Sequence, residues 1–367
     1  MRRIVLVLPS LDTGGTERQA VATALALAAA GHGITVAVLT GGGPMTGDLQ
    51  AAGIPIQVLG PGRLAAIAAL WRLAQQWGAD AVYGYLPTAN LVCATLKAMP
   101  WRPRIVFGIR TAGLPLHEYP AVVRLAYGLQ GWAARWLADL VICNSEAARA
   151  EFLACGLPTG KVRAVPNGID TSRFRPDAEA RAAQRAEWGL APDAVAIGLP
   201  ARIDPLKDHA TFLAAAGILA RCHAQARFFC IGGGDPAARQ RLERQAAGLG
   251  LDGRLTWTGG LADMTRALNG LDVVTLTSRV EGFPNALAEA MACGLPCVGT
   301  QVGDVAALLG DAGLVVPPGD PVALAEAWDG LMEGETRQRM GAAGRHRVAA
   351  EYGLAALASR TLRAMEL

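Results

Sequence analysis

Short apolar runs alternate with amphipathic stretches along the whole chain. The runs fall at residues 3–8, 34–39, 56–59, 81–84, 105–108, 140–143 and 162–165 in the first half, and at residues 195–199, 227–231, 254–257, 272–276, 296–299 and 313–316 in the second. Continuous apolar runs of this length are typical of parallel strands that are buried on both faces. Because helical stretches separate most of them, the pattern predicts an α/β fold in both halves.

A polar, proline-containing segment from Pro166 to Asp193 interrupts this alternation. A chain of 367 residues is long enough for two domains, each with its own core. We therefore expect two Rossmann-like doubly wound domains, residues 1–170 and 171–345, facing each other across a cleft. The mostly helical residues 346–367 are expected to pack back on the first domain.

The composition narrows the class of protein. With 52% hydrophobic residues the chain is not disordered, and a net charge of +3 is too small for a dedicated nucleic-acid binder, so no nucleic-acid partner is expected. The longest largely apolar run, Ala20 to Ala30, is shorter than the roughly 18 to 20 residues of a spanning helix. Met1-Arg-Arg is followed by a strand-like run, which does not resemble a signal peptide. The chain is therefore expected to be soluble and cytoplasmic.

The most informative segment, Ser278 to Pro296, follows the apolar run at 272–276. Ligands of open α/β sheets bind at the carboxyl ends of strands. Asn285 is placed to cap a short helix, whose N-terminal amides could bind a phosphate or sugar hydroxyls. Glu281 precedes this helix and Glu289 lies about one turn inside it, so two separated polyol groups could be bound. A capped helix with solvated glutamates explains the same residues.

Two further segments also follow apolar runs. Arg202 and Lys207 are cations on the loop after 195–199 and could converge on a diphosphate, although a solvated turn with local Arg–Asp and Lys–Asp pairs is the alternative. Gly14 and Gly15, within the segment Leu11-Asp-Thr-Gly-Gly, would let the backbone approach a ligand at a helix N-terminus. This segment does not match the GxGxxG dinucleotide-binding fingerprint. The mismatch argues against a nicotinamide oxidoreductase.

Taken together, these segments carry a resemblance. Glu281-Gly-Phe-Pro with Glu289 eight residues later matches the E-x7-E motif of retaining glycosyltransferases. The full set, in family order and spacing, is Gly14-Gly15, Asn144-Ser145-Glu146, Val165-Pro-Asn167-Gly168-Ile-Asp170 with Phe174, Arg202 and Lys207, and Glu281 and Glu289. Over nearly its full length the chain resembles glycosyltransferase family 4, which has the two-Rossmann GT-B architecture.

The resemblance implies a role for each domain. Residues 1–170 would bind the acceptor, and residues 171–345 would bind a nucleotide-sugar, with a UDP-sugar as the favoured donor. Glu289 would bind the ribose hydroxyls, and Arg202 with Lys207 would bind the diphosphate. Gly15 would approach the diphosphate from the first domain. The sugar would be held by Glu281 and by the backbone of the following residues, Gly282, Phe283, Pro284, Asn285 and Ala286.

One position departs from the family pattern. Where the family often has a histidine near the donor sugar, this chain reads Phe107-Gly-Ile-Arg110-Thr, so Arg110 is expected to take that place. The chain contains no D-x-D motif, and we expect neither a metal nor another cofactor. The resemblance thus implies a hexosyltransferase that retains configuration without a metal. A nucleotide-sugar epimerase or a non-catalytic nucleotide-sugar-binding module is the alternative.

The charge of the first predicted domain bears on the kind of partner that it could bind. Residues 1–170 carry 14 Lys or Arg against 9 Asp or Glu, which suits an anionic partner or reflects unevenly spread solvated charge. The segment from Arg124 to Trp136, like Trp101 to Arg104, mixes arginines with aromatic residues, so it could rest on an anionic membrane. Core packing of an amphipathic helix is the favoured explanation. The family resemblance implies a glycan or polyprenyl-diphosphate-linked acceptor for surface polysaccharide or glycolipid, used at the inner face of the cell membrane.

Overall fold

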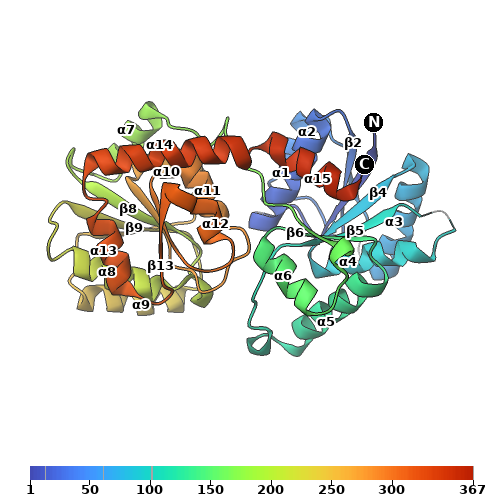
Figure 1. Ribbon diagram of the computed structural model, residues 1–367, viewed down its shortest axis with the longest axis horizontal. Helices are drawn as coiled ribbons and strands as arrows, with labels where there is room; N and C mark the ends of the chain where they lie inside the picture. The colour runs from blue at the N-terminus through green and yellow to red at the C-terminus, as the bar shows by residue number, and fades with distance from the viewer. Residues whose placement is uncertain (13, 61, 101, 367) are drawn as a thin grey trace. The chain divides into compact units, whose positions relative to one another are not determined.

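The computed structural model describes residues 1–12, 14–60, 62–100 and 102–366, so Thr13 and Trp101, which belong to two of the segments above, lie outside the described residues. The chain forms two compact units, each drawn with its elements in Figure 1. Unit 1 comprises Met1–Gly168 and Leu354–Leu367, and unit 2 comprises Ile169–Gly353.

Unit 1 is built on a seven-stranded parallel sheet with the order β3-β2-β1-β4-β5-β6-β7. Its strands are β1 Arg3–Leu8, β2 Gly33–Val38, β3 Ile56–Val58, β4 Ala81–Tyr85, β5 Arg104–Ile109, β6 Leu140–Cys143 and β7 Val162–Ala164. Its helices are α1 Gly15–Ala29, α2 Thr46–Ala51, α3 Arg63–Trp77, α4 Leu86–Ala94, α5 Ala121–Trp136, α6 Glu146–Ala154 and α15 Leu354–Met365, with 3₁₀ turns η1 Thr95–Ala98, η2 Leu116–Glu118 and η3 Thr159–Lys161.

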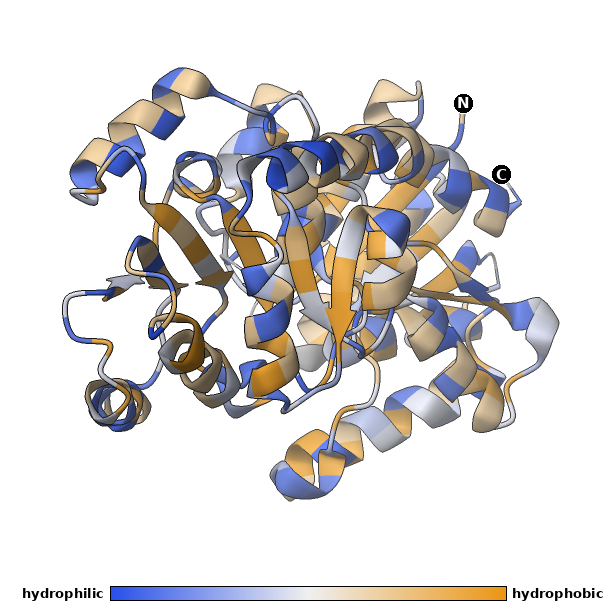
Figure 2. Cartoon of the chain, turned by 60° about the vertical axis from the view of Figure 1, so that its left-hand side comes forward, coloured by the Kyte–Doolittle hydropathy of each residue, from blue (hydrophilic) through white to orange (hydrophobic). Residues whose placement is uncertain are grey.

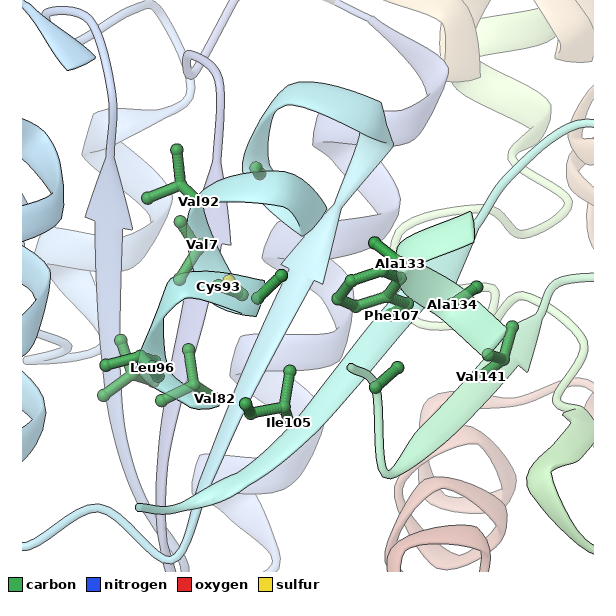
Figure 3. Close-up of a cluster of buried hydrophobic side chains, with 14 of the residues drawn as sticks. Val7, Val82, Val92, Cys93, Leu96, Ile105, Phe107, Ala133, Ala134 and Val141 are labelled. Carbon is green, nitrogen blue, oxygen red and sulfur yellow. The ribbon is translucent and has the colours of Figure 1, made fainter. Parts of the chain in front are cut away.

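Helices cover both faces of this sheet. Helices α3, α4, α5 and α6 pack on one face, and α1, α2 and α15 pack on the other. Figure 3 shows part of the first layer, where Ala133 and Ala134 of α5 lie next to Phe107 of β5 and Val141 of β6. The part of α5 that packs against the sheet is therefore made of small side chains.

Unit 2 is built on a six-stranded parallel sheet with the order β10-β9-β8-β11-β12-β13. Its strands are β8 Val195–Pro200, β9 Ala226–Ile231, β10 Leu255–Gly259, β11 Val273–Leu276, β12 Cys297–Thr300 and β13 Gly313–Val316. Its helices are α7 Ala178–Glu187, α8 His209–Leu219, α9 Pro236–Gly248, α10 Met264–Gly270, α11 Asn285–Ala292, α12 Val305–Leu309, α13 Pro321–Asp329 and α14 Gly334–Glu351, with 3₁₀ turns η4 Pro205–Lys207 and η5 Gly310–Ala312.

The predicted strands are all present, each within two residues at either end. Their hydrophobic character is visible in Figure 2, in which the central strands are mainly orange. In unit 2 the sheet lies between a layer of α8, α9 and α13 and a layer of α10, α11, α12 and α14. The expected pair of doubly wound α/β sheets is therefore confirmed.

The connections between the units differ from the predicted limits. The chain leaves unit 1 after Gly168. The side-chain amide nitrogen of Gln19 donates a hydrogen bond to the Gly168 carbonyl (3.1 Å), and the Gln19 side-chain oxygen accepts one from the Gly168 backbone amide (3.2 Å). This boundary falls inside the segment 166–193, and the rest of that segment packs on unit 2, where Arg181 and Arg185 of α7 form ion pairs with Asp272.

At the other end, α14 continues to Glu351 and packs on α11, so the chain returns to unit 1 at Leu354 rather than at residue 346. From there α15 packs against α1. None of the helices in the described ranges is long and apolar enough to cross a bilayer.

Candidate active site

The central pair of strands in unit 2 marks the point where strand order reverses. The sheet grows outward from β8 in one direction through β9 and β10, and from β11 in the other through β12 and β13. Loops at the carboxyl ends of two such strands diverge and leave room for a ligand. Arg202 and Lys207 follow β8, and Glu281 follows β11. Two of the predicted segments are thus neighbours at this position.

A direct contact joins these segments. The Lys207 ammonium group forms an ion pair with Oε1 of Glu281, and the Ser278 hydroxyl donates a hydrogen bond of 2.7 Å to the same oxygen. The two charged side chains are only 26% and 13% exposed, so solvent screens the pair less than it would screen a surface pair. Lys207 therefore does not pair with a local aspartate, and that interpretation of this segment is wrong for Lys207.

Backbone contacts fix the two loops to each other. The Thr277 hydroxyl donates to the carbonyl of Lys207 (2.8 Å), and the Arg279 amide donates to the carbonyl of Leu206 (2.8 Å). Asp208 is buried, caps α8 and accepts a hydrogen bond of 3.1 Å from Arg279 Nε. The ammonium of Lys207 is consequently presented from a loop with fixed backbone.

Arg202 differs from Lys207 in its surroundings. Its side chain is exposed and makes no hydrogen bond or ion pair with the described residues. Its neighbours are held by the glycine-rich loop after β9: Ile203 N donates to Gly233 O at 2.8 Å, and a Cβ at Gly232 would lie 2.2 Å from the carbonyl oxygen of Ala201. These glycines therefore have a structural role, and Arg202 remains available to an anion.

Helix α11 places the second glutamate of the motif. Glu289 lies in this helix with 6% of its surface exposed. Asn285 does not cap the helix as predicted. It is the first helical residue, whereas Pro284 occupies the cap position and provides no side-chain hydrogen bond. The helix begins after a proline whose φ is fixed by its ring, so the local preference of asparagine does not decide the cap.

The loop between the two glutamates is largely buried. The Phe283 ring is buried in the core of unit 2 against Tyr352, with centroids 5.5 Å apart. Gly282 is buried, and its carbonyl accepts a hydrogen bond from the Asp304 amide at 3.1 Å. Phe283 is thus a packing residue, and any ligand contact in this loop comes from its backbone and from Asn285 or Ala286, which are partly exposed.

Sequence reasoning missed one residue that supports this loop. Gly303 has φ +50°, and a Cβ there would lie 2.2 Å from the carbonyl oxygen of Glu281. A lone glycine after a strand is not informative in sequence, and no motif marked it. Close approach of two backbones requires glycine here.

The Gly303→Ala variant is expected to lose stability and activity. The positive φ alone costs an alanine about 1 kcal/mol, and displacing the Glu281 backbone adds about 1–3 kcal/mol. Chemical denaturation measures the total. Gly319→Ala is the matched control, since Gly319 has φ +72° but no heavy atom within 4 Å of the place a Cβ would take. Equal losses in both variants would show that the Glu281 contact is unimportant.

In unit 1 the predicted residues lie at the carboxyl edge of the other sheet. Gly14 precedes α1 and Gly15 is its first residue, so the first amides of the helix, which have no partner within the helix itself, follow β1. A Cβ at Gly14 would lie 1.9 Å from Glu17 Oε2, which shows that this carboxylate covers the glycine. The Glu17 carboxylate therefore occupies the space beside Gly14 where the backbone is expected to approach a ligand.

Arg110 follows β5 and is held by neutral groups. It donates to the Tyr83 hydroxyl (2.7 Å) and to Asn167 Oδ1 (3.2 Å), and its guanidinium lies 4.1 Å from the centre of the Tyr85 ring. Burial raises the pKa of Tyr83 well above its ordinary value, so this hydroxyl stays neutral. Among the described residues no carboxylate neutralises Arg110, which leaves a fixed cation at the sheet edge.

The aromatic segment of α5 is not core. Its buried residues are Gln130, Ala133 and Ala134, whereas Trp132 and Trp136 are 57% and 62% exposed. The favoured core-packing explanation for these tryptophans is therefore wrong. An exposed stripe runs along the helix at spacings of three and four residues: Val122, Leu125, Leu129, Trp132 and Trp136.

Two family models match consecutive parts of the chain. The model described as Glycosyltransferase Family 4 matches residues 13–173, and the model described as Glycosyl transferases group 1 matches residues 193–334. The first match covers nearly all of unit 1 before Gly168, and the second covers the strands of unit 2 with Arg202, Lys207, Glu281 and Glu289.

Named relatives are similar over part of their length. A GDP-mannose-dependent alpha-(1-6)-phosphatidylinositol monomannoside mannosyltransferase of Mycolicibacterium smegmatis is 32% identical over 221 residues, 57% of each chain. A D-inositol 3-phosphate glycosyltransferase of Saccharomonospora viridis is 34% identical over 177 residues, 45% of this chain and 41% of the relative. The chain spans about half the length of the curated relatives it matches.

Solved structures show the same fold. Anabaena Alr3699/HepE in complex with UDP and glucose superposes with a TM-score of 0.86 at 21% identity, covering all of both chains. WaaG, a glycosyltransferase involved in lipopolysaccharide biosynthesis, superposes with a TM-score of 0.74 at 17% identity over 98% of each chain. At these identities the likeness concerns the fold, which is the expected GT-B type. With both family models matched in order, the chain belongs to the group 1, family 4 glycosyltransferases.

Proposed function

We propose that this protein transfers a sugar from a nucleoside diphosphate sugar, with a UDP-sugar as the favoured donor, to a glycan or a polyprenyl-diphosphate-linked acceptor. The products would be surface polysaccharide or glycolipid. The observation that carries the proposal is the ion pair between Lys207 and Glu281, which brings a cation and a carboxylate from two loops to the switch point of the unit 2 sheet.

Each residue type suits one part of such a donor. The exposed Arg202 offers a planar fork to a diphosphate, and Lys207 offers a compact charge. Glu289 is buried in the middle of α11, where a carboxylate can accept hydrogen bonds from ribose hydroxyls. Glu281, together with the backbone of residues 282–286, would accept and donate hydrogen bonds to the sugar.

The proposed reaction retains the configuration of the sugar. The bond between the anomeric carbon and the diphosphate oxygen breaks, and a bond from that carbon to the acceptor hydroxyl oxygen forms on the same face. The departing phosphate oxygen takes the proton of the acceptor hydroxyl. Lys207 and Arg202 would neutralise the charge that develops on the leaving diphosphate, so the step is proposed to need no metal.

Unit 1 would supply the acceptor side and further positive charge. Arg110 keeps its charge without an acidic partner in the described part of the chain, and the α1 amides after Gly14 are donors at the positive end of a helix dipole. An anionic group of the donor or acceptor suits both features. For the α1 amides, Glu17 would have to move aside.

The named similarities support the donor and acceptor classes. HepE was solved with UDP and glucose, and the mycobacterial relative is named as acting on a phosphatidylinositol mannoside. The first fits a UDP-sugar donor, and the second fits a lipid-linked acceptor.

Titration calorimetry tests the donor site. UDP, GDP and ADP are titrated into the protein with EDTA present throughout, and tight binding of one of them is expected. Turnover of the matching nucleotide-sugar then separates a transferase from a non-catalytic binding module. Failure of all three nucleotides to bind, with EDTA and equally with added Mg²⁺ or Mn²⁺, would refute the proposed donor site.

We further propose that α5 docks on the cytoplasmic face of an anionic membrane. Its exposed stripe supplies apolar contact. Arg124, whose side chain has no partner among the described residues, supplies charge. In liposome flotation the protein is expected to float with anionic vesicles and not with neutral ones. The Leu125→Glu/Leu129→Glu variant should stay in the soluble fraction, as should the wild type if the docking proposal is wrong.

A further inference from the structure

Unit 1 contains a cavity of about 450 Å³ beside Arg110. It lies among the end of β5, the loop that follows, and helices α5 and α6, with the first residues of α4 completing the wall. Most of its wall is apolar, and the side chains that set this character include Leu86, Ile109, Leu114, Leu116, Phe152 and Leu157. The volume is in the range of small-molecule sites.

Two glycines within α5 form part of the wall. Gly128 and Gly131 lie in the middle of this 16-residue helix, where glycine is the least favourable residue apart from proline. Neither has a positive φ, and no heavy atom lies within 4 Å of the place a Cβ would take. Neither backbone conformation nor packing within unit 1 therefore requires glycine. Their effect is to leave space on the cavity side of the helix.

The cavity meets the exposed stripe of α5 at Trp132. Trp132 lines the cavity and is also 57% exposed, and the neighbouring Leu125 and Leu129 are exposed as well. A ligand with an apolar body could thus extend from the cavity past Trp132 onto this helix face. Apolar surface of this kind, continuous with a cavity, marks a binding surface rather than scattered exposure.

The charges on the wall favour an anionic end group. Arg110, Arg124 and Arg135 line the cavity, while Glu151 is its one acidic lining residue in the described part of the chain. Glu151 accepts a hydrogen bond of 2.8 Å from the Gly113 amide, and Arg135 donates to the Gly156 carbonyl at 2.7 Å. Among the described residues, neither Arg110 nor Arg124 forms an ion pair with a carboxylate. An apolar cavity with excess positive charge suits a hydrocarbon chain that ends in a phosphate.

We infer that this cavity binds the hydrocarbon chain next to the phosphate of a lipid-linked acceptor. That the bound lipid phosphate belongs to the acceptor rests on the proposed function, whereas the binding site is defined by the residues that line the cavity. The chain would lie against the apolar residues beside α5, its phosphate would be neutralised by the wall arginines, and its remaining length would leave along the exposed stripe.

Binding of short lipid phosphates tests this site. Farnesyl phosphate, dodecyl phosphate and inorganic phosphate are titrated into the full chain below the concentrations at which the lipids form micelles. Farnesyl phosphate is expected to bind more tightly than inorganic phosphate. Dodecyl phosphate has a main chain of the same length without branches, so its rank against farnesyl phosphate tells an isoprenoid carrier from an acyl lipid.

Cavity-filling variants give the decisive comparison. Gly131→Leu and Gly128→Leu are expected to weaken farnesyl phosphate binding by about tenfold or more, because added methylenes occupy the space of the ligand. Both changes raise helix propensity, so folding should be retained. Gly131→Ala, which adds one methyl group, should have a smaller effect. Gly47→Leu is the matched control, since Gly47 lies in α2 with no heavy atom within 4 Å of its Cβ position and does not line the cavity.

The outcomes separate this inference from the proposed function. If farnesyl phosphate binds no better than inorganic phosphate, or if the leucine variants bind it as the wild type does, the cavity assignment is overturned. If the lipid binds and the leucine variants lose it, the assignment stands, even where UDP, GDP and ADP all fail to bind and the donor site is refuted. UDP binding should be the same in Gly131→Leu as in the wild type.

Discussion

Replacing Lys207 with alanine is expected to lower kcat by about a hundredfold or more. This is the effect of removing one preorganised group that stabilises charge developing in a transition state. Lys207 is held beside Glu281 by a loop whose backbone is bound to the neighbouring loop, so its charge is already in place before the donor binds. Release of nucleoside diphosphate from the nucleotide-sugar measures kcat.

A purely structural role for Lys207 predicts a different result. In that case stability would fall, but UDP and uridine would both bind as before. If Lys207 contacts the diphosphate, Lys207→Ala should weaken the binding of UDP and leave uridine unaffected, and Lys207→Arg should recover part of kcat. Arg239→Ala, which removes an exposed cation paired with Glu243 on α9, is the control and should keep wild-type kcat. An unchanged kcat in Lys207→Ala would refute its assignment.

The Glu289→Ala variant is expected to bind its nucleotide about ten- to a hundredfold more weakly. A hydrogen bond to a charged group contributes about 1.5–3 kcal/mol, and every 1.4 kcal/mol is roughly a factor of ten in Kd. Because Glu289 is 6% exposed, water replaces the lost carboxylate poorly. Titration calorimetry with the preferred nucleotide measures the change.

Binding of the free base by the same variant tests whether Glu289 contacts the ribose. The free base of the preferred nucleotide lacks the ribose, so its binding should not change in Glu289→Ala. Glu289→Gln retains one acceptor oxygen and should bind the nucleotide between the wild type and the alanine variant. Glu326→Ala, at an exposed position of α13, is the control. If Glu289→Ala melts like the wild type and binds the nucleotide equally well, Glu289 does not hold the ribose.

Most of the strands could be predicted from sequence because they are buried on both faces. A strand of that kind, such as Arg3–Leu8 or Val195–Pro200, must be apolar along nearly its whole length, and no neighbour is needed to recognise it. Since parallel strands end at one edge, residues that follow them could also be placed there. This is why Arg202, Lys207 and Glu281 were expected at one site.

Contacts across loops could not be predicted in the same way. The Lys207–Glu281 pair joins residues 74 positions apart and depends on how two loops pass each other. The Gly303 contact with the Glu281 carbonyl has the same origin. Local preference also failed at Asn285, where the preceding proline and the packing of Phe283 decide where the helix begins.

The orientation of α5 could not be predicted from sequence for a different reason. Its sequence is amphipathic, but the pattern does not say which face meets the sheet. Ala133 and Ala134 are the residues that pack with Phe107 and Val141, and Trp132 and Trp136 are left exposed. Gly128 and Gly131, which no sequence motif marked, then line a cavity.

The sequence by itself determined the two parallel sheets, the family and the residue types that follow β8 and β11, because strand periodicity and motif spacing are local properties of the chain. The tertiary structure alone decided the division at Gly168, the partner of Lys207, the exposed face of α5 and the cavity beside Arg110. Each of these depends on the volume left between elements far apart in the chain, and that volume is set only when the elements pack.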